Sequence, residues 1–210
     1  MKLLPLIMIL PIIGVAACSE SPSEPGTPPN NGGPAHSAFL TPAANGGFGL
    51  TLIDPRTVRH TDAAGIGYAL VIGKNGNQYV GYVGLLPGTS LTASPPSAGG
   101  VLLSGTYTLR EFNNIVQSGN TATANDDESS GVIALVADFG AGTVTGATAG
   151  SNPELTVNGT FSGSTLSGTV THAGLEGQLV GAINADEAIG TFHGHNDTMV
   201  YVGGFIALSP

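Results

Sequence analysis

The segment richest in potential metal ligands is residues 193–197, which read His193, Gly194, His195, Asn196 and Asp197. In an extended strand, alternate side chains point to the same side, so His193, His195 and Asp197 would share one face. Two imidazoles and a carboxylate are ligands that zinc or iron can use. The spacing indicates a candidate metal site, although polar residues ending in Asn-Asp are equally typical of a turn at a strand end.

A second candidate is the run of carboxylates Asp126, Asp127 and Glu128, which lies within the polar segment 117–131. A calcium loop of the EF-hand type needs ligands at fixed intervals and a glycine at its turn, and this run lacks that glycine. Long polar segments in a compact domain are usually functional loops or disordered. We therefore predict a solvated loop; the alternative is that its three acids bind a cation or a basic partner.

Sequence patterns that mark common enzymes are absent from the chain. It contains no Gly-x-Ser-x-Gly elbow, phosphate-binding loop or His-Glu-x-x-His motif, and no paired acids mark a glycosidase. Glu187 could look catalytic, yet in a barrel turn a carboxylate is expected to accept backbone N–H bonds. The sequence predicts no cofactor and a protein that is not an enzyme.

The only cysteine of the 210 residues, Cys18, follows two alanines at the end of an apolar segment. That segment, residues 3–17, is shorter than the about 20 apolar residues of a spanning helix and is typical of a signal peptide. An ordinary secretory signal would fit the run equally well, and an uncleaved anchor is the remaining alternative. Residues 15–18, however, resemble the bacterial lipobox, in which the cysteine is acylated and becomes the first mature residue. We expect residues 1–17 to be removed and Cys18 to carry palmitate-type lipid.

Composition divides the rest of the chain into a linker and one domain. Residues 18–36 are rich in Pro, Gly, Ser and Asn and contain no large apolar side chain, which predicts a disordered linker behind the lipidated cysteine. Residues 37–210 have the length of a single domain. The net charge of −9 excludes a nucleic-acid partner, which would need a basic stripe. We expect a monomer that contacts the bacterial outer membrane through its lipid.

Alternating apolar and polar residues predict β-strands along the whole domain. In residues 155–161, for example, Leu155, Val157 and Phe161 alternate with polar residues. Low charge with many Gly and Thr argues against helices. The strands and the turns between them predict an all-β fold, a small antiparallel up-and-down β-barrel of about eight strands with extra hairpin strands. Strands are expected at residues 48–53, 67–72, 78–86, 105–112, 132–139, 143–147, 155–161, 166–171, 177–183, 188–193 and 200–207.

One segment of the chain also resembles a known family. Ala185, Glu187, Gly190 and Phe192 match Ala-x-Glu-x-x-Gly-x-Phe, the signature of the β-barrel domains of transferrin-binding protein B. With the segments 137–146 and 202–207, which resemble neighbouring barrel strands, the similarity covers about residues 131–210. The chain departs from the family in having one barrel instead of two lobes with handle domains.

The resemblance implies a single-barrel relative that is lipid-anchored in the outer membrane, on the cell surface or facing the periplasm. Such relatives bind diverse ligands, often iron-linked, so the expected ligand is a protein or a nutrient such as an iron or haem compound. Binding would use barrel loops, for which residues 87–100 and 117–131 are candidates. The resemblance does not extend to transferrin binding. The alternatives are a structural, periplasm-facing lipoprotein without a specific ligand and, least favoured, a secreted enzyme.

Replacing Cys18 with Ala should leave the precursor unprocessed and without lipid, because the thiol is the acyl acceptor. Mass spectrometry of protein extracted from native membranes should find the wild type beginning at Cys18 with added lipid mass. Ser21→Ala, a matched change in the linker, should leave processing intact. An unmodified Cys18 thiol in the wild-type protein would contradict the assignment.

Overall fold

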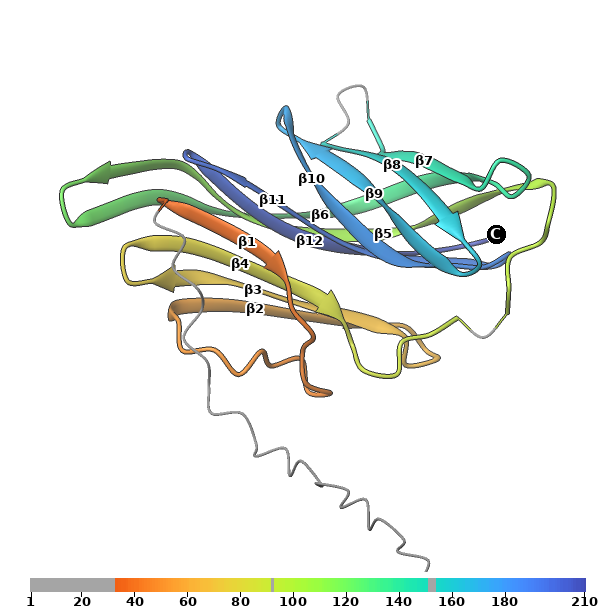
Figure 1. Ribbon diagram of the computed structural model, residues 1–210, viewed down its shortest axis with the longest axis horizontal. Helices are drawn as coiled ribbons and strands as arrows, with labels where there is room; N and C mark the ends of the chain where they lie inside the picture. The colour runs from red at the N-terminus through yellow and green to blue at the C-terminus, as the bar shows by residue number, and fades with distance from the viewer. Residues whose placement is uncertain (1–32, 92, 151–153) are drawn as a thin grey trace, which may run out of the picture.

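The computed structural model describes residues 33–91, 93–150 and 154–210, and these residues form twelve β-strands. The strands build a four-stranded sheet and a closed eight-stranded barrel that lies against it (Figure 1). Within the described ranges there is no helix that could cross a membrane. The predicted signal peptide, Cys18 and most of the predicted linker lie outside the described residues.

The barrel is an antiparallel meander in which each strand pairs with the next and the last pairs with the first. This confirms the predicted up-and-down barrel. Closure pairs both edges of the strands within the barrel, while the part of β6 before Ile133 pairs only with β5. The strands are β5 (Gly100–Ser118), β6 (Thr121–Asp138), β7 (Thr143–Thr148), β8 (Leu155–Ser162), β9 (Thr165–His172), β10 (Leu175–Ile183), β11 (Glu187–Asn196) and β12 (Met199–Leu208).

The inside of the barrel is a packed apolar core. Alternate residues of every strand point inward, as an eight-stranded barrel requires to fill its interior. Two aromatic side chains from neighbouring strands, Phe192 and Phe205, are fully buried at its centre. Aliphatic side chains surround them, among them Leu103, Ile133, Leu135, Val144, Leu155, Val157, Leu166, Val170 and Leu179.

The second unit is a sheet of four strands in the order β1-β4-β3-β2, with β1 parallel to β4 and the other pairs antiparallel. One face of this sheet packs on the outside of β11 and β12, and Figure 1 shows the two layers side by side. The strands are β1 (Ala35–Phe39), β2 (Ile53–Thr61), β3 (Gly67–Asn75) and β4 (Gln78–Leu85).

Both faces of the central strands β3 and β4 are buried. On the barrel side, Tyr68, Leu70 and Ile72 pack with apolar residues of β11 and β12. On the other side, Val80 and Tyr82 are covered by apolar side chains from residues 48–52. This double burial explains why the two strands contain continuous apolar runs instead of a strict alternation.

Two glycines let the sheet approach the barrel closely. A Cβ atom at Gly204 of β12 would lie 2.6 Å from the Tyr68 ring, and one at Gly81 of β4 would lie 2.6 Å from Cγ1 of Val202. Real Cβ contacts do not occur at such distances. A larger residue at either position would therefore push the sheet away from β12.

Three expectations about secondary structure are wrong. Residues 48–52 form no strand, because their apolar side chains cover the outer face of β3 and β4. The exposed strand β2 was missed, since it contains Pro55 and shows no alternation, which an edge strand tolerates. Segment 117–131 is not a loop, because only residues 119–120 form a turn and the rest extends β5 and β6. In addition, β1 begins at Ala35, inside the segment expected to be linker.

Replacing Phe192 with Ala should lower the free energy of unfolding by about 3–5 kcal/mol, because a fully buried ring leaves a cavity in a packed core. Phe161→Ala is the matched control, since this ring is only partly buried and packs edge-on against Phe139. Phe161→Ala should lower the free energy of unfolding by clearly less than Phe192→Ala does. Denaturant unfolding of both variants measures the difference, and a loss below about 1 kcal/mol for Phe192→Ala would contradict the inward orientation of this ring.

Candidate functional site

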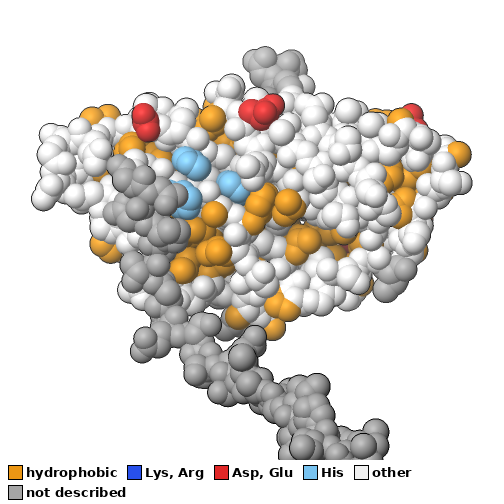
Figure 2. Space-filling model, viewed as in Figure 1, with side chains coloured by type: hydrophobic (Ala, Val, Ile, Leu, Met, Phe, Trp, Pro, Cys, Tyr) orange, Lys and Arg blue, Asp and Glu red, His pale blue; other side chains and the backbone are white. Residues whose placement is uncertain are grey.

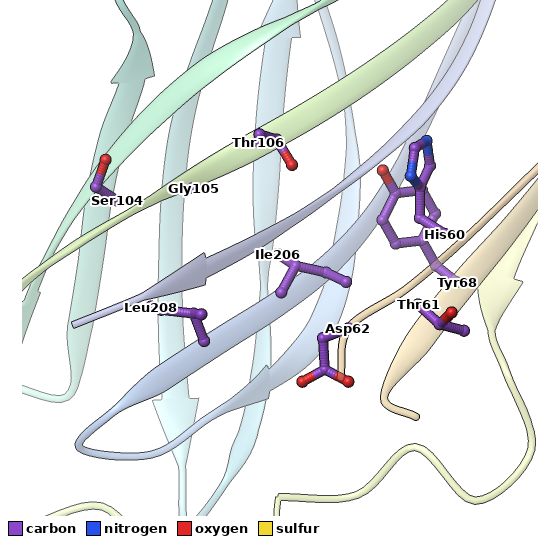
Figure 3. A pocket seen from close by; sticks show the side chains of 9 residues that line it. All are labelled: His60, Thr61, Asp62, Tyr68, Ser104, Gly105, Thr106, Ile206 and Leu208. Atoms are coloured by element: carbon purple, nitrogen blue, oxygen red, sulfur yellow. The ribbon is translucent and has the colours of Figure 1, made fainter. Parts of the chain in front are cut away.

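A cleft opens where the end of β2 and the start of β3 meet the barrel strands β5 and β12. We call it the seam cleft. It has a volume of about 280 Å³. Figure 3 shows side chains of the sheet on one side of it and side chains of the barrel on the other. Its lining residues are His60, Thr61, Asp62, Tyr68, Ser104, Gly105, Thr106, Ile206 and Leu208.

The sheet side of the seam cleft is held in place by contacts to both units. The His60 ring lies 5.3 Å from the Tyr68 ring, centroid to centroid, and its Nε2 is 2.9 Å from the Thr108 hydroxyl of β5. Asp62 Oδ1 accepts the backbone N–H of Ile66 at 2.8 Å across the β2–β3 turn. The cleft therefore combines a fixed imidazole and a fixed carboxylate with a barrel side made of the apolar Ile206 and Leu208 and the hydroxyl-bearing Ser104 and Thr106.

A buried carboxylate, Glu187, lies next to the Asp62 side of the cleft. Its side chain borders a second cavity of about 290 Å³, and its Oε1 atom has no hydrogen-bond partner. Burial and the neighbouring charge of Asp62 raise the pKa of Glu187. The expectation that Glu187 accepts backbone N–H bonds is wrong, because the side-chain oxygen of Asn184 accepts the N–H groups of Asp186 and Glu187, both at 2.8 Å.

An exposed apolar surface continues from the seam cleft across β12, β5 and β6. Leu102, Val132 and Val136 are each more than half exposed, at 55%, 52% and 55%, and Leu208 is 48% exposed. The strand register places Leu102 beside Val136 on this side of the barrel, and Leu208 beside Ser104. We call these four side chains the outer apolar face. Exposed large apolar side chains gathered on neighbouring strands suit an interaction site.

The three carboxylates expected in a loop instead lie on β6, in its long pairing with β5. Asp126 lies 3.4 Å from Nε of Arg56 in β2 and 3.6 Å from Arg110 in β5, and Glu128 forms an ion pair with Arg110. Asp127 accepts a hydrogen bond from Asn113 at 2.8 Å. All three acids therefore already have partners within the protein. Asp126 in particular links β2 of the sheet to the β5–β6 hairpin of the barrel.

His193 and His195 do point to the same side of β11, and there they meet β1. The Ser37 hydroxyl lies 2.8 Å from Nδ1 of His193 and 3.0 Å from Nδ1 of His195. The His36 ring packs at 5.4 Å from the His195 ring. We call His36, His193 and His195 the histidine cluster, and Figure 2 shows histidines gathered beside hydrophobic side chains on the viewed face.

The predicted metal set is not assembled. Asp197 is exposed in the turn between β11 and β12, and the described residues contain no group of three or more His, Cys, Asp or Glu that could hold a metal ion. The three histidines instead bond and pack β1 against the barrel. Burial lowers the pKa of His193 to about 4, with His195 and His36 contributing, and burial also lowers the pKa values of His195 and His36.

A polar network that the sequence did not reveal lies inside one end of the barrel. His172 Nε2 is 2.5 Å from the Glu111 carboxylate, and the Tyr107 and Ser129 hydroxyls donate to the Glu154 carboxylate. Burial opposes protonation of His172 and is the largest single effect, but the bonds to Glu111 and to the Glu154 carbonyl and the charges of both carboxylates together outweigh it, so the pKa of His172 is raised. The bond to His172 lowers the pKa of Glu111. Glu111 and His172 are 61 positions apart, and no local motif connects them.

Comparisons with known proteins identify similar folds. No family model matches the chain, and no curated protein matches its sequence. Transferrin binding protein B of Neisseria meningitidis is 11% identical with a TM-score of 0.45, covering 73% of this chain and 35% of that one. The same protein from Haemophilus parasuis, as a mutant, is 18% identical with a TM-score of 0.47, covering 72% and 36%. The apo haemoglobin receptor HpuA of Kingella denitrificans is 13% identical with a TM-score of 0.32, covering 73% and 67%.

The chain thus spans little more than a third of the length of these transferrin binding proteins. The similarities concern the fold.

Acidification should destabilise the protein through the histidine cluster. The folded-state pKa of His193, about 4, lies below the ordinary 6.5, so the unfolded chain binds more protons between these values. Stability should therefore fall as the pH decreases from 6.5 to 4, by up to roughly 3 kcal/mol for His193. Thermal unfolding at pH 7 and pH 4.5 measures the loss.

The double variant His193→Gln and His195→Gln should lose clearly less stability over this pH range than the wild type. His60→Gln, outside the histidine cluster, is the matched control and should keep the wild-type loss. An equal loss in the double variant would show that other groups cause the acid sensitivity.

Proposed function

We propose that this chain is a lipid-anchored surface protein of the bacterial outer membrane that binds a protein partner at the seam cleft and the outer apolar face. The observation that carries the proposal is the continuity of the two features. Leu208 belongs to both, and the other three exposed side chains lie on the neighbouring strands β5 and β6. The lipobox-like residues 15–18 and the linker behind them support the anchored location.

The size of the cleft favours a protein over a free small molecule. Pockets for drug-sized ligands usually measure about 300–1,000 Å³, and the seam cleft, at about 280 Å³, lies just below that range. A single side chain of a partner fills such a space, which is how interface anchors bind. The outer apolar face would then supply the surrounding contact area.

Other parts of the described chain offer less to a partner. The barrel interior is filled by its own core, and Asp126 and Glu128 are paired with arginines. The connection from β4 to β5 remains a candidate loop, because Gly88, Ser90 and Leu91 border the cavity beside Glu187.

The polar network inside the barrel supports a binding role in preference to catalysis. His172 is only 7% exposed, and both of its ring nitrogens have partners within the protein. A catalytic acid or base must reach its substrate. These residues instead hold strands β5 and β9 to each other across the barrel.

Site-specific photo-crosslinking in the native host tests the proposal. A photoreactive residue at Val136 should form an adduct with one other protein, because this position lies on the outer apolar face. The same residue at Asn158, which is exposed on the polar outside of β8, is the matched control and should form none. The adduct partner is identified by mass spectrometry and then purified.

A second variant tests whether the seam cleft and the outer apolar face bind the same partner. Leu208→Lys should lower the affinity of the purified partner at least tenfold, while the melting temperature changes by only a few degrees, because the side chain is half exposed. No adduct at Val136, or an adduct with a second copy of the chain, would overturn the proposal. Resistance of the domain to protease added to intact cells would instead support a periplasm-facing lipoprotein.

A further inference from the structure

Strand β2 is the last strand of the four-stranded sheet, and its outer edge is open. It pairs with β3 on one side, and no described strand pairs with it on the other (Figure 1). Every residue of β2 except Val58 is exposed. An open edge is a template for a further strand, and many proteins protect such edges.

Only the first part of the β2 edge is protected. Pro55 lies there, and the register with β3 shifts between Ile53 and Arg56. A proline and a bulge both hinder the addition of a strand. Residues 57–61, in contrast, pair regularly with residues 67–71 of β3 and contain neither feature. This regular part leads to the seam cleft, whose lining includes Thr61.

The hydrogen bonds of the β2–β3 turn show which backbone groups of β2 point to the open side. The N–H of Asp62 donates to the carbonyl oxygen of Ile66 at 2.9 Å, so Asp62 bonds towards β3. Bonded and non-bonded pairs alternate along antiparallel strands. By this alternation the N–H and C=O groups of Thr57, Arg59 and Thr61 point away from β3, and they have no partner among the described residues.

The barrel surface beside this edge is not covered by the sheet. Strand β2 lies over β5, where His60 Nε2 meets the Thr108 hydroxyl at 2.9 Å, and β6 is the next barrel strand. Neighbouring strands are about 4.8 Å apart in either layer, so a strand added to β2 would lie over β6. There it would cover Val132, the cross-strand partner of the cleft residue Thr106.

We propose that the partner adds an extended strand to residues 57–61 of β2 and thereby covers the outer apolar face. The inference rests on the proposed function, because it states how that partner binds. In strand addition, backbone hydrogen bonds provide affinity, and pockets for alternate side chains provide specificity. The seam cleft at the end of the open edge is such a pocket.

The charge at the edge further defines the partner strand. Arg56 and Arg110 form ion pairs with acids of the β5–β6 hairpin, and Lys74 lies over the Tyr79 ring. Within the described ranges, Arg59 forms no ion pair and is exposed. Opposite charges on neighbouring strands attract. We therefore expect apolar residues on the barrel side of the partner strand and an acidic residue beside Arg59 on its solvent side.

Proline substitution tests the inference at the backbone of the full chain. Thr57→Pro and Arg59→Pro each remove an N–H that points away from β3, so β2 keeps its bonds to β3. Each should lower the affinity of the crosslinked and purified partner by about tenfold or more, as expected when a backbone bond of a complex is lost. Thr57→Ala is the matched control, because it keeps the N–H, and it should bind as the wild type does.

Amide hydrogen exchange of the wild-type protein gives a second measurement, which decides the outcome if a proline variant fails to fold. Binding of the partner should slow exchange at Thr57, Arg59 and Thr61 by about tenfold or more. Exchange at Val58 should change less, because its neighbours along β2 point to the open side and its own N–H points to β3.

Full affinity in both proline variants, or unchanged exchange at the three amides, would overturn the inference. The proposed function would survive that result, since it depends on the adduct at Val136 and on the effect of Leu208→Lys. Absence of any adduct at Val136 would overturn both.

Discussion

The packing of the four-stranded sheet on β11 and β12 is the contact on which the rest of the structure depends. It buries these two barrel strands on both faces, inward by the barrel core and outward by the sheet. The contact requires small residues at Gly81 and Gly204, where a Cβ atom would collide with the Val202 side chain and the Tyr68 ring, respectively. With no cysteine after Cys18, burial of apolar surface must hold the two units together.

The polar features of interest lie along the edges of this contact. The histidine cluster lies where β1 meets β11, and the seam cleft with the Asp62 and Glu187 carboxyls lies where the β2–β3 turn meets the barrel. Neither place belongs to one unit alone. Polar groups at such an edge are partly removed from water yet need not be fully paired, and they can therefore respond to protons or partners in ways that a closed core cannot.

The barrel was predictable from the sequence because its strands have one buried and one exposed face. Leu155, Val157 and their neighbours alternate, and glycine turns separate the strands. The edge strands β1 and β2 were not predictable, since one is only five residues long and the other is exposed at every position except Val58. The shared orientation of His193 and His195 followed from spacing. Their partner Ser37, more than 150 positions away, and the cleft around Asp62 depend on how two sheets pack, which no local pattern encodes.

The position of β1 has a mechanical consequence. The chain enters the described domain at this strand, on the side of the predicted tether, so a pull from the membrane would be applied at Ala35. Because β1 runs parallel to β4 and is paired with it over five consecutive positions, tension along the strand would load these backbone bonds together, in shear. Such an arrangement resists force better than one in which bonds open one at a time. The bonds from Ser37 to the histidines of β11 would share that load, so the strand that meets the tether is also bonded directly to the barrel.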